Sequence, residues 1–174
     1  MPIAPDTKDW TWVLHERCPE CAFDPLEVER EDIGRRIRHA AAAIHQRLHG
    51  EAVSERPDDE TWSPLEYGAH VRDVCGVMLT RLEQMLEHDD PEFANWDQDR
   101  AALDGGYRSL DAEHVAAALD LAAASLANAA DAVPTDAWNR SGRRSNGSVF
   151  TVETLLRYAL HDLEHHVVDV QRAD

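Results

Sequence analysis

The chain has 174 residues, of which 43% are hydrophobic, so a single domain with its own core is expected. Acidic residues outnumber basic ones by 34 to 17, and the net charge of −17 disfavours nucleic-acid binding because it repels phosphates. No apolar run reaches the length of a membrane span, the N-terminus does not resemble a signal peptide, and three cysteines do not suggest a secreted disulfide scaffold, so we expect a cytoplasmic protein without membrane contact.

Residues 1–24 read as an irregular arm that packs on a domain formed by residues 25–174. The arm contains Trp10, Trp12 and Phe23, and such large apolar rings normally require burial. It also contains Cys18 and Cys21 in a CxxC motif, a spacing that suits zinc or a redox dithiol. A closed zinc site needs four ligands and His15 is the nearest addition, so zinc, redox and purely structural roles all stay open.

Two helices are expected in the first half of the domain. From Pro25 to Leu48, apolar residues recur at intervals of three and four, which predicts a helix. The next helix, from Pro64 to about Glu87, has the clearest start in the chain. Ser63 is a good N-cap, Pro64 fits the first helical position, and Glu66 completes a capping box with Ser63. His70 lies about two turns into this helix, where it is either a buried histidine with a structural partner or a metal ligand.

Two long connections flank a third helix. Residues 88–110 are acidic and irregular, and their length means that they either cross the end of the bundle or travel along it. The third helix is expected to start at the N-cap Asp111 and to end before Pro134. Residues 134–150 then include three arginines in an acidic protein, which form either a solvated loop or a grip for a carboxylate or phosphate; they are Arg140, Arg143 and Arg144.

The last helix, from Thr151 to Arg172, carries His161 and His165 four residues apart. On a helix this spacing places two side chains on one face, where two neutral imidazoles can bind one divalent metal. The same spacing also occurs by chance in solvated or buried histidines. Periodicity does not settle whether His165 or its neighbour His166 points inward.

Four helices without a strand signal predict an all-α four-helix bundle with an irregular N-terminal arm. Metal sites in bundles are built from side chains that project inward from facing helices. If the second and fourth helices are adjacent, His70 meets His161 and His165 in a three-histidine metal site with an open fourth position.

The segment Trp62–Glu66 leading to His70, and the segment His161–His166, together resemble the DinB-like superfamily, which includes YfiT-like metal-dependent hydrolases and mycothiol-dependent maleylpyruvate isomerases. The resemblance spans roughly residues 25 to 172. It implies a bundle with up-down-down-up topology and a metal bound by His70, His161 and His165. In the isomerase branch the position that matches His161 is typically Glu.

The resemblance implies a low-molecular-weight thiol as cosubstrate for a transferase or isomerase acting on a small electrophile. A hydrolase of a small ester or amide is the alternative, because a metal (Zn, Ni or Fe) can activate a thiolate or water. A non-catalytic bundle that binds a small molecule or a partner is a third possibility. Asp73, Asp162 and Glu164 are candidates to support the ligands from outside. The chain could form a homodimer.

Overall fold

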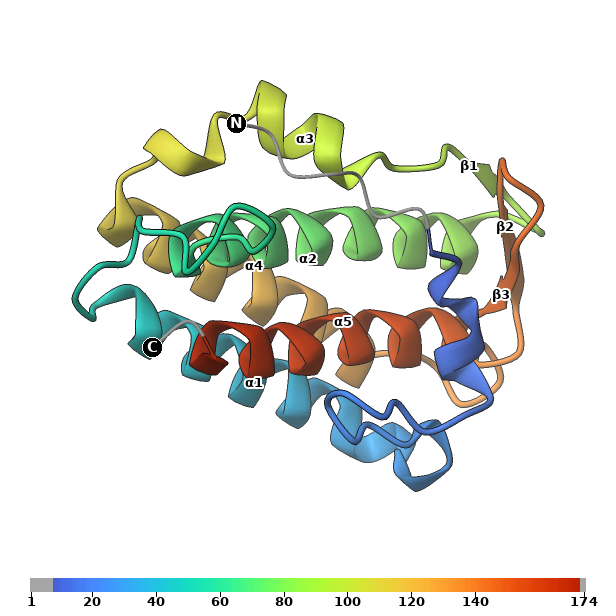
Figure 1. Cartoon of the computed structure of the whole chain (residues 1–174). Helices are drawn as coiled ribbons and strands as arrows, with labels where there is room; N and C mark the ends of the chain where they lie inside the picture. The colour runs from blue at the N-terminus through green and yellow to red at the C-terminus, as the bar shows by residue number, and fades with distance from the viewer. Residues whose placement is uncertain (1–7, 173–174) are drawn as a thin grey trace.

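Four long helices pack side by side in the computed structural model, which describes residues 8–172 (Figure 1). Three short strands and a short helix lie in the connections between them. The elements are α1 (Ile33–Leu48), α2 (Pro64–Glu87), β1 (Glu92–Phe93), α3 (Gln98–Asp104), α4 (Ala112–Asp131), β2 (Ser141–Arg144), β3 (Val149–Thr151) and α5 (Val152–Arg172).

The bundle has the predicted up-down-down-up topology. Helices α1 and α5 run in one direction, and α2 and α4 run in the other (Figure 1). Each of α1 and α2 packs mainly against α4 and α5. Because α2 and α4 are parallel, the connection between them travels the length of the bundle, and α3 forms within it (Figure 1). This arrangement makes α2 and α5 neighbours, which the predicted metal site requires.

Helix α2 begins with the predicted capping box, formed by Ser63 and Glu66. The Glu66 backbone N–H donates to Ser63 Oγ at 3.3 Å, and the Ser63 N–H donates to the Glu66 carboxylate at 3.0 Å. Arg56 forms an ion pair with the same carboxylate, and both side chains are largely buried. Burial raises the pKa of Glu66, but hydrogen bonds from Arg56 and Ser63 outweigh it, so the net pKa lies below its ordinary value. The ion pair therefore joins the α1–α2 connection to the first turn of α2, four residues before His70.

Helix α1 approaches α4 closely at Gly34. A Cβ atom at this position would overlap the carboxylate of Asp131 and lie 2.9 Å from the backbone oxygen of Ala127. Gly76 on α2 differs, because a Cβ atom there would meet no atom within 4 Å. The apolar core lies between the four helices, and the close contact at Gly34 brings two of them together.

The first helix is shorter than predicted. Its predicted beginning, from Pro25, consists of two short 3-10 turns (Pro25–Glu27 and Arg30–Asp32), and α1 starts at Ile33. The Asp24 side chain accepts a hydrogen bond from the Leu26 N–H at 2.9 Å, so it caps the first of these turns. An Asp before Pro is a local signal for such a turn, and it competes with the helical periodicity.

A small three-stranded sheet was not predicted. Strand β2 pairs in parallel with β1 and antiparallel with β3. The β2–β3 hairpin turns at Asn146-Gly147, where Gly147 has a φ of 97°. Asn-Gly is the strongest short hairpin signal in a sequence, and here the strands beside it were too short to be recognised. The sheet joins the two long connections at one end of the bundle (Figure 1).

The described part of the N-terminal arm packs on α5. A 3-10 helix, η1 (Trp10–Leu14), contacts α5, and Val13, Cys18 and Phe23 are buried. The first seven residues of the predicted arm lie outside the described part of the chain. No helix within residues 8–172 is both long and apolar enough to cross a membrane.

Candidate metal centre

Three side chains from α2 and α5 converge in a cluster that could hold a metal ion: His70, Asp162 and His166. One ligand atom from each lies within 4.8 Å of the other two. His70 Nε2 is 3.4 Å from Asp162 Oδ1, and His166 Nε2 is 3.5 Å from the same oxygen. Asp162 and His166 are four residues apart on α5, so their side chains lie on one face of the helix. That face is turned towards α2.

The chemistry of these atoms fits a metal ion. Within the described chain, both ring nitrogens of His70 and the Oδ1 atom of Asp162 are buried without a hydrogen-bond partner. Buried polar atoms without partners are costly and rare, so each requires an explanation. A cation between the imidazole nitrogens and the carboxylate oxygen would provide the missing partner. Two histidines and one carboxylate are an established ligand set for catalytic zinc and for non-haem iron.

The protonation states of His70 and Asp162 suit metal binding. Burial lowers the pKa of His70, which therefore stays neutral at pH 7. Burial raises the pKa of Asp162, but the neighbouring His70 and His166 rings lower it more, to about 2, so its carboxylate is ionised. Neutral imidazole and ionised carboxylate are the forms that bind metals.

Aromatic rings and one carboxylate hold the two histidines in place. The His70 ring contacts Trp62, at 5.2 Å between ring centroids, and Trp96, which stacks on it at 5.6 Å. His166 Nδ1 is 2.8 Å from a carboxylate oxygen of Asp169. Burial lowers the pKa of His166, but this contact with Asp169 raises it above its ordinary value. A carboxylate on the outer nitrogen of an imidazole orients the ring and leaves Nε2 to face the cluster.

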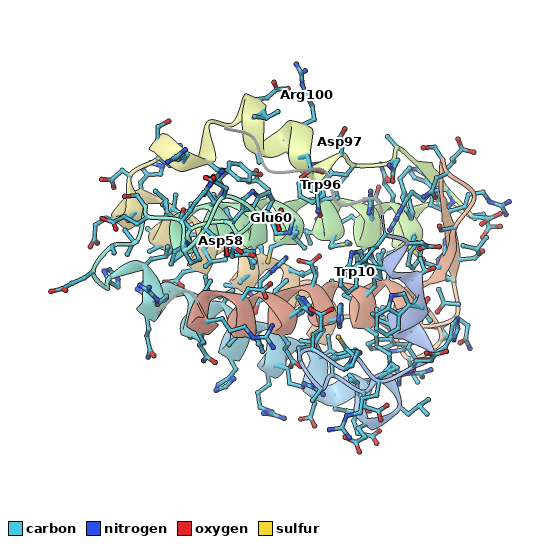
Figure 2. The ribbon with its side chains drawn as sticks, in the orientation of Figure 1. Trp10, Asp58, Glu60, Trp96, Asp97 and Arg100 are labelled. Atoms are coloured by element: carbon cyan, nitrogen blue, oxygen red, sulfur yellow. The ribbon has the colours of Figure 1, made fainter. Side chains whose placement is uncertain are left out.

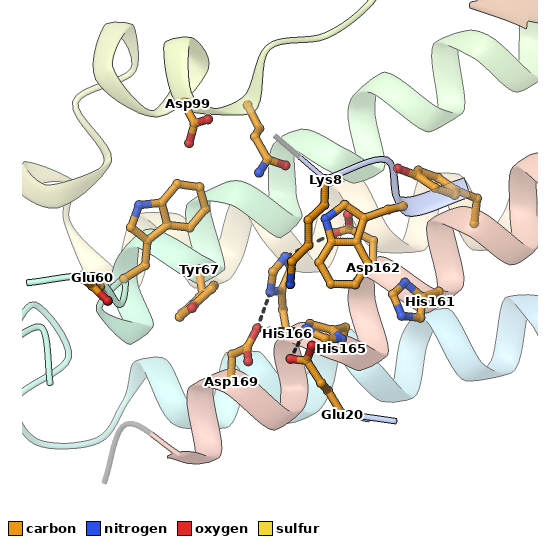
Figure 3. A pocket seen from close by; sticks show the side chains of 14 residues that line it. Lys8, Glu20, Glu60, Tyr67, Asp99, His161, Asp162, His165, His166 and Asp169 are labelled. Atoms are coloured by element: carbon orange, nitrogen blue, oxygen red, sulfur yellow. Dashed lines mark hydrogen bonds and ion pairs between the residues drawn. The ribbon is translucent and has the colours of Figure 1, made fainter. Parts of the chain in front are cut away.

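Two members of the cluster, Asp162 and His166, line a cavity of about 400 Å³ (Figure 3), and the buried His70 is not among its described lining residues. Asp162, His166 and Asp169 line the cavity from α5, Tyr67 lines it from the first turn of α2, and Trp62 lines it from just before that helix. Its remaining walls come from the arm, the α1–α2 connection, the α2–α4 connection and α5, through Lys8, Trp10, Glu20, Glu60, Gln98, Asp99, Tyr158, His161 and His165. Figure 2 shows Trp10 and Trp96 on the face of the bundle formed by α2 and α5.

The predicted set of His70, His161 and His165 is divided between two clusters. His70 lies beside His166, with ring centroids 4.8 Å apart. His161 and His165 instead lie with Cys18 and Cys21, and ligand atoms of these four residues are all within 4.8 Å of one another. Periodicity left the choice between His165 and His166 open, and the structure turns His166 towards α2.

The predicted anion grip does not reach the cavity. Arg140 donates to the backbone oxygens of Met85 and His88, at 2.6 and 2.7 Å. Arg143 forms an ion pair with Asp90, and the Arg144 guanidinium lies 5.1 Å from the ring centroid of Phe150. None of the three arginines is among the described residues that line the cavity.

Of the three carboxylates predicted to support the ligands, Asp162 lies in the cluster itself. Asp73 accepts a hydrogen bond from the Tyr107 hydroxyl and forms an ion pair with Arg72. Glu164 binds Arg36 through two hydrogen bonds of 2.7 Å. The carboxylate that contacts a candidate ligand from outside is Asp169, and its signal in the sequence was the i, i+3 spacing from His166.

Comparisons with known proteins give a family and a fold. A family model described as the DinB superfamily matches residues 33–168. The solved structure of YfiT from Bacillus subtilis, described as a probable metal-dependent hydrolase with an unusual four-helix bundle topology, superposes with a TM-score of 0.75. The two sequences are 14% identical, and the match covers 87% of this chain and 91% of YfiT. A search of curated proteins found no match.

Proposed function

This chain belongs to the DinB superfamily, and from that premise we propose that it is a metal-dependent hydrolase of small esters or amides. The observation that carries the proposal is the cluster of His70, Asp162 and His166 at the wall of the cavity. Three protein ligands leave a position for water or substrate, which is the arrangement of catalytic rather than structural sites. The description of YfiT as a probable metal-dependent hydrolase supports the same class of reaction.

A divalent metal held in this way would lower the pKa of a bound water to about 7 and polarise a carbonyl oxygen. The protein's own residues prepare the ligands. Asp169 holds the outer nitrogen of His166, and the rings of Trp62 and Trp96 pack against His70. Excluding water around the ligands strengthens the electrostatic interactions at the site. Asp162 contributes the negative charge of the ligand set.

The lining of the cavity favours uncharged or cationic substrates. Five carboxylates line it, from Glu20, Glu60, Asp99, Asp162 and Asp169, against one lysine, Lys8. A field of this sign disfavours anionic substrates, which is the opposite of what an arginine grip would select. A volume of about 400 Å³ lies within the range of small-molecule sites, so the substrate is a small molecule rather than a polymer.

One observation favours thiol-dependent transfer as a second candidate. The ligand set contains a carboxylate, Asp162, between two histidines. The thiol-dependent isomerases that the chain resembles typically have a carboxylate, Glu, on this helix, at the position that matches His161, one residue before Asp162. In that case a low-molecular-weight thiol would bind as the thiolate and attack a small electrophile. Zinc, nickel and iron are all compatible with two imidazoles and a carboxylate.

The experiment is an activity screen of the metal-loaded full chain. Small neutral and cationic esters and amides are tested without thiol, and small electrophiles are tested with a panel of low-molecular-weight thiols. His70→Ala should lower the turnover by at least about 100-fold, because the site loses a ligand. His39→Ala, at an exposed histidine on α1, is the matched control and should keep full activity. Hydrolysis that is the same in His70→Ala would overturn the proposal, and metal binding without turnover would indicate a non-catalytic module.

A further inference from the structure

A second cluster of metal-ligating side chains joins the N-terminal arm to α5. Cys18 and Cys21 come from the arm, and His161 and His165 come from the helix about 140 residues later. One ligand atom from each lies within 4.8 Å of the other three. We propose that these four residues bind a second metal ion, a zinc in a closed Cys₂His₂ site that fastens the arm to the bundle. This site uses different ligands from the proposed catalytic centre, and the cobalt experiment below detects its thiolate ligands without depending on that centre.

The distances are close to those of a tetrahedral zinc site. With Zn–S of about 2.3 Å and Zn–N of about 2.0–2.1 Å, adjacent ligand atoms in a tetrahedron lie roughly 3.3–3.8 Å apart. Cys18 Sγ is 3.8 Å from His165 Nδ1, and the whole set lies within 4.8 Å. Side-chain adjustments of about 1 Å would therefore complete the coordination.

The four side chains have the chemistry that zinc requires. Cys18, Cys21 and Cys75 are free cysteines, so the thiols of the CxxC motif are available as ligands. His161 is 4% exposed, and its Nε2 atom is buried without a hydrogen-bond partner. Two thiolates balance the 2+ charge of the ion, which makes a buried site of this composition neutral. Thiolate together with imidazole in a tetrahedral set is typical of structural zinc.

Groups around the cluster support the ligands. His165 Nε2 lies 3.8 Å from carboxylate oxygens of both Glu20 and Asp169, so its outer nitrogen faces negative charge while Nδ1 faces Cys18. In the arm, the Cys18 N–H donates to the Phe23 oxygen at 2.8 Å. This bond closes the turn that holds both thiols next to α5.

The ion would stabilise the folded arm, which has little regular secondary structure of its own. The described arm contains only one 3-10 helix of five residues before Cys18, and such a segment gains little stability from its own backbone. A metal that binds only the folded state adds its binding free energy to folding. All four positions are filled by protein, so the site is structural rather than catalytic.

The second ion would also position one wall of the catalytic cavity. The Trp10 ring lies 5.8 Å from His161 and 5.3 Å from His165, measured between ring centroids. Trp10 and Glu20 both line the cavity, and Glu20 is labelled there in Figure 3. Loss of the second ion should therefore weaken substrate binding, and so raise KM, more than it lowers kcat.

The test measures zinc content in the full chain purified without an affinity tag. The wild-type protein should bind two zinc ions, and the double variant Cys18→Ser/Cys21→Ser should bind one. His70→Ala should also bind one, because it removes the other site. Cys75→Ser, at a buried cysteine outside both clusters, is the control and should bind two. Two ions in the double variant would overturn the proposal.

Cobalt distinguishes the two sites directly. Protein loaded with Co²⁺ should show thiolate-to-cobalt charge-transfer absorption in the wild type and in His70→Ala, but not in Cys18→Ser/Cys21→Ser. If the double variant does not fold, the Cys75→Ser protein provides the measurement, since it has two thiols. The thiols of Cys18 and Cys21 should be protected from a thiol reagent while zinc is bound, and they should react once a chelator has removed the zinc. Thiols that react equally before and after chelation, or a Cys18–Cys21 disulfide in place of zinc, would rule the site out.

Discussion

His165 and His166 are consecutive residues, yet their imidazoles belong to different clusters. Their ring centroids are 5.8 Å apart and the ring planes are at 86°. His165 turns towards Cys18 on the arm, and His166 turns towards His70 on α2. With 3.6 residues per turn, neighbouring positions on a helix point about 100° apart. One short stretch of α5 thus supplies ligands in two directions.

This division predicts that neighbouring alanine substitutions have separate effects. His166→Ala should abolish turnover and leave the thiolate-to-cobalt absorption unchanged, whereas His165→Ala should weaken that absorption and keep most of the turnover number. Both measurements use metal-loaded protein at equal occupancy of the remaining site. The same loss of both signals in the two variants would contradict the division.

Asp169 should act through His166. Asp169→Asn removes the negative charge on the outer nitrogen of the ring, which should lower metal affinity by about 10–100-fold because the imidazole becomes less basic and less well oriented. Competition against a chromophoric chelator measures the affinity, and Cys18→Ser/Cys21→Ser serves as the background so that a single site is titrated. Asp136→Asn, at an exposed position, is the control. An unchanged affinity in Asp169→Asn would show that the contact has no role in binding.

Alanine substitutions at two helical glycines should change the free energy of unfolding in opposite directions. Gly34→Ala places a Cβ atom against Asp131 and Ala127 and should lower the free energy of unfolding by about 1–3 kcal/mol. Gly76→Ala meets no atom within 4 Å on an exposed part of α2 and should raise it by about 0.5–1 kcal/mol. Urea unfolding at constant zinc concentration measures both. A neutral Gly34→Ala would show that α1 and α4 are less tightly packed than described.

The Arg56–Glu66 ion pair should account for part of the loss of folding stability at acid pH. The pKa of Glu66 is lowered in the folded state, so the unfolded chain takes up its proton first as the pH falls, and stability declines from about pH 5 downward. Glu66→Gln should lose about 1–3 kcal/mol of stability at pH 7, because a charged hydrogen-bonding group is removed. Its difference from the wild type should shrink towards acid pH in thermal melts. Glu83→Gln, at an exposed site on α2, is the control. A constant difference across this pH range would contradict the assignment.

The parts of the fold that were predictable have local causes. The capping box fixed the start of α2 at Pro64, because its donors and acceptors lie within four residues. The β2–β3 hairpin was missed because its strands are too short for a periodic pattern, although Asn146-Gly147 marked the turn. The partners of Cys18 and Cys21 could not be found from the motif, since they lie about 140 residues away.

For the candidate site, the sequence indicated which helices supply the ligands but not which side chains of α5 face α2. The sequence identified α2 and α5 as the source of the ligands, and His70 as the contribution of α2. It pointed to His161 and His165 because their spacing places two imidazoles on one helix face, and the family resemblance implied the same pair. The pair Asp162 and His166 has the same four-residue spacing, and only the rotation of α5 in the bundle decides which pair faces α2.

That rotation has a consequence for engineering and for natural variation. A one-residue insertion in α5 just before His161 would turn the whole ligand segment about its helical axis by about 100°. Such a change would put His161 and His165 in the places of Asp162 and His166, and would put Glu164 in the place of His165. The cysteine cluster would then lose both of its histidines, so neither centre could shift alone. Length changes should therefore be tolerated in the β2–β3 hairpin and at the C-terminal end of α5, and excluded from the first half of the helix.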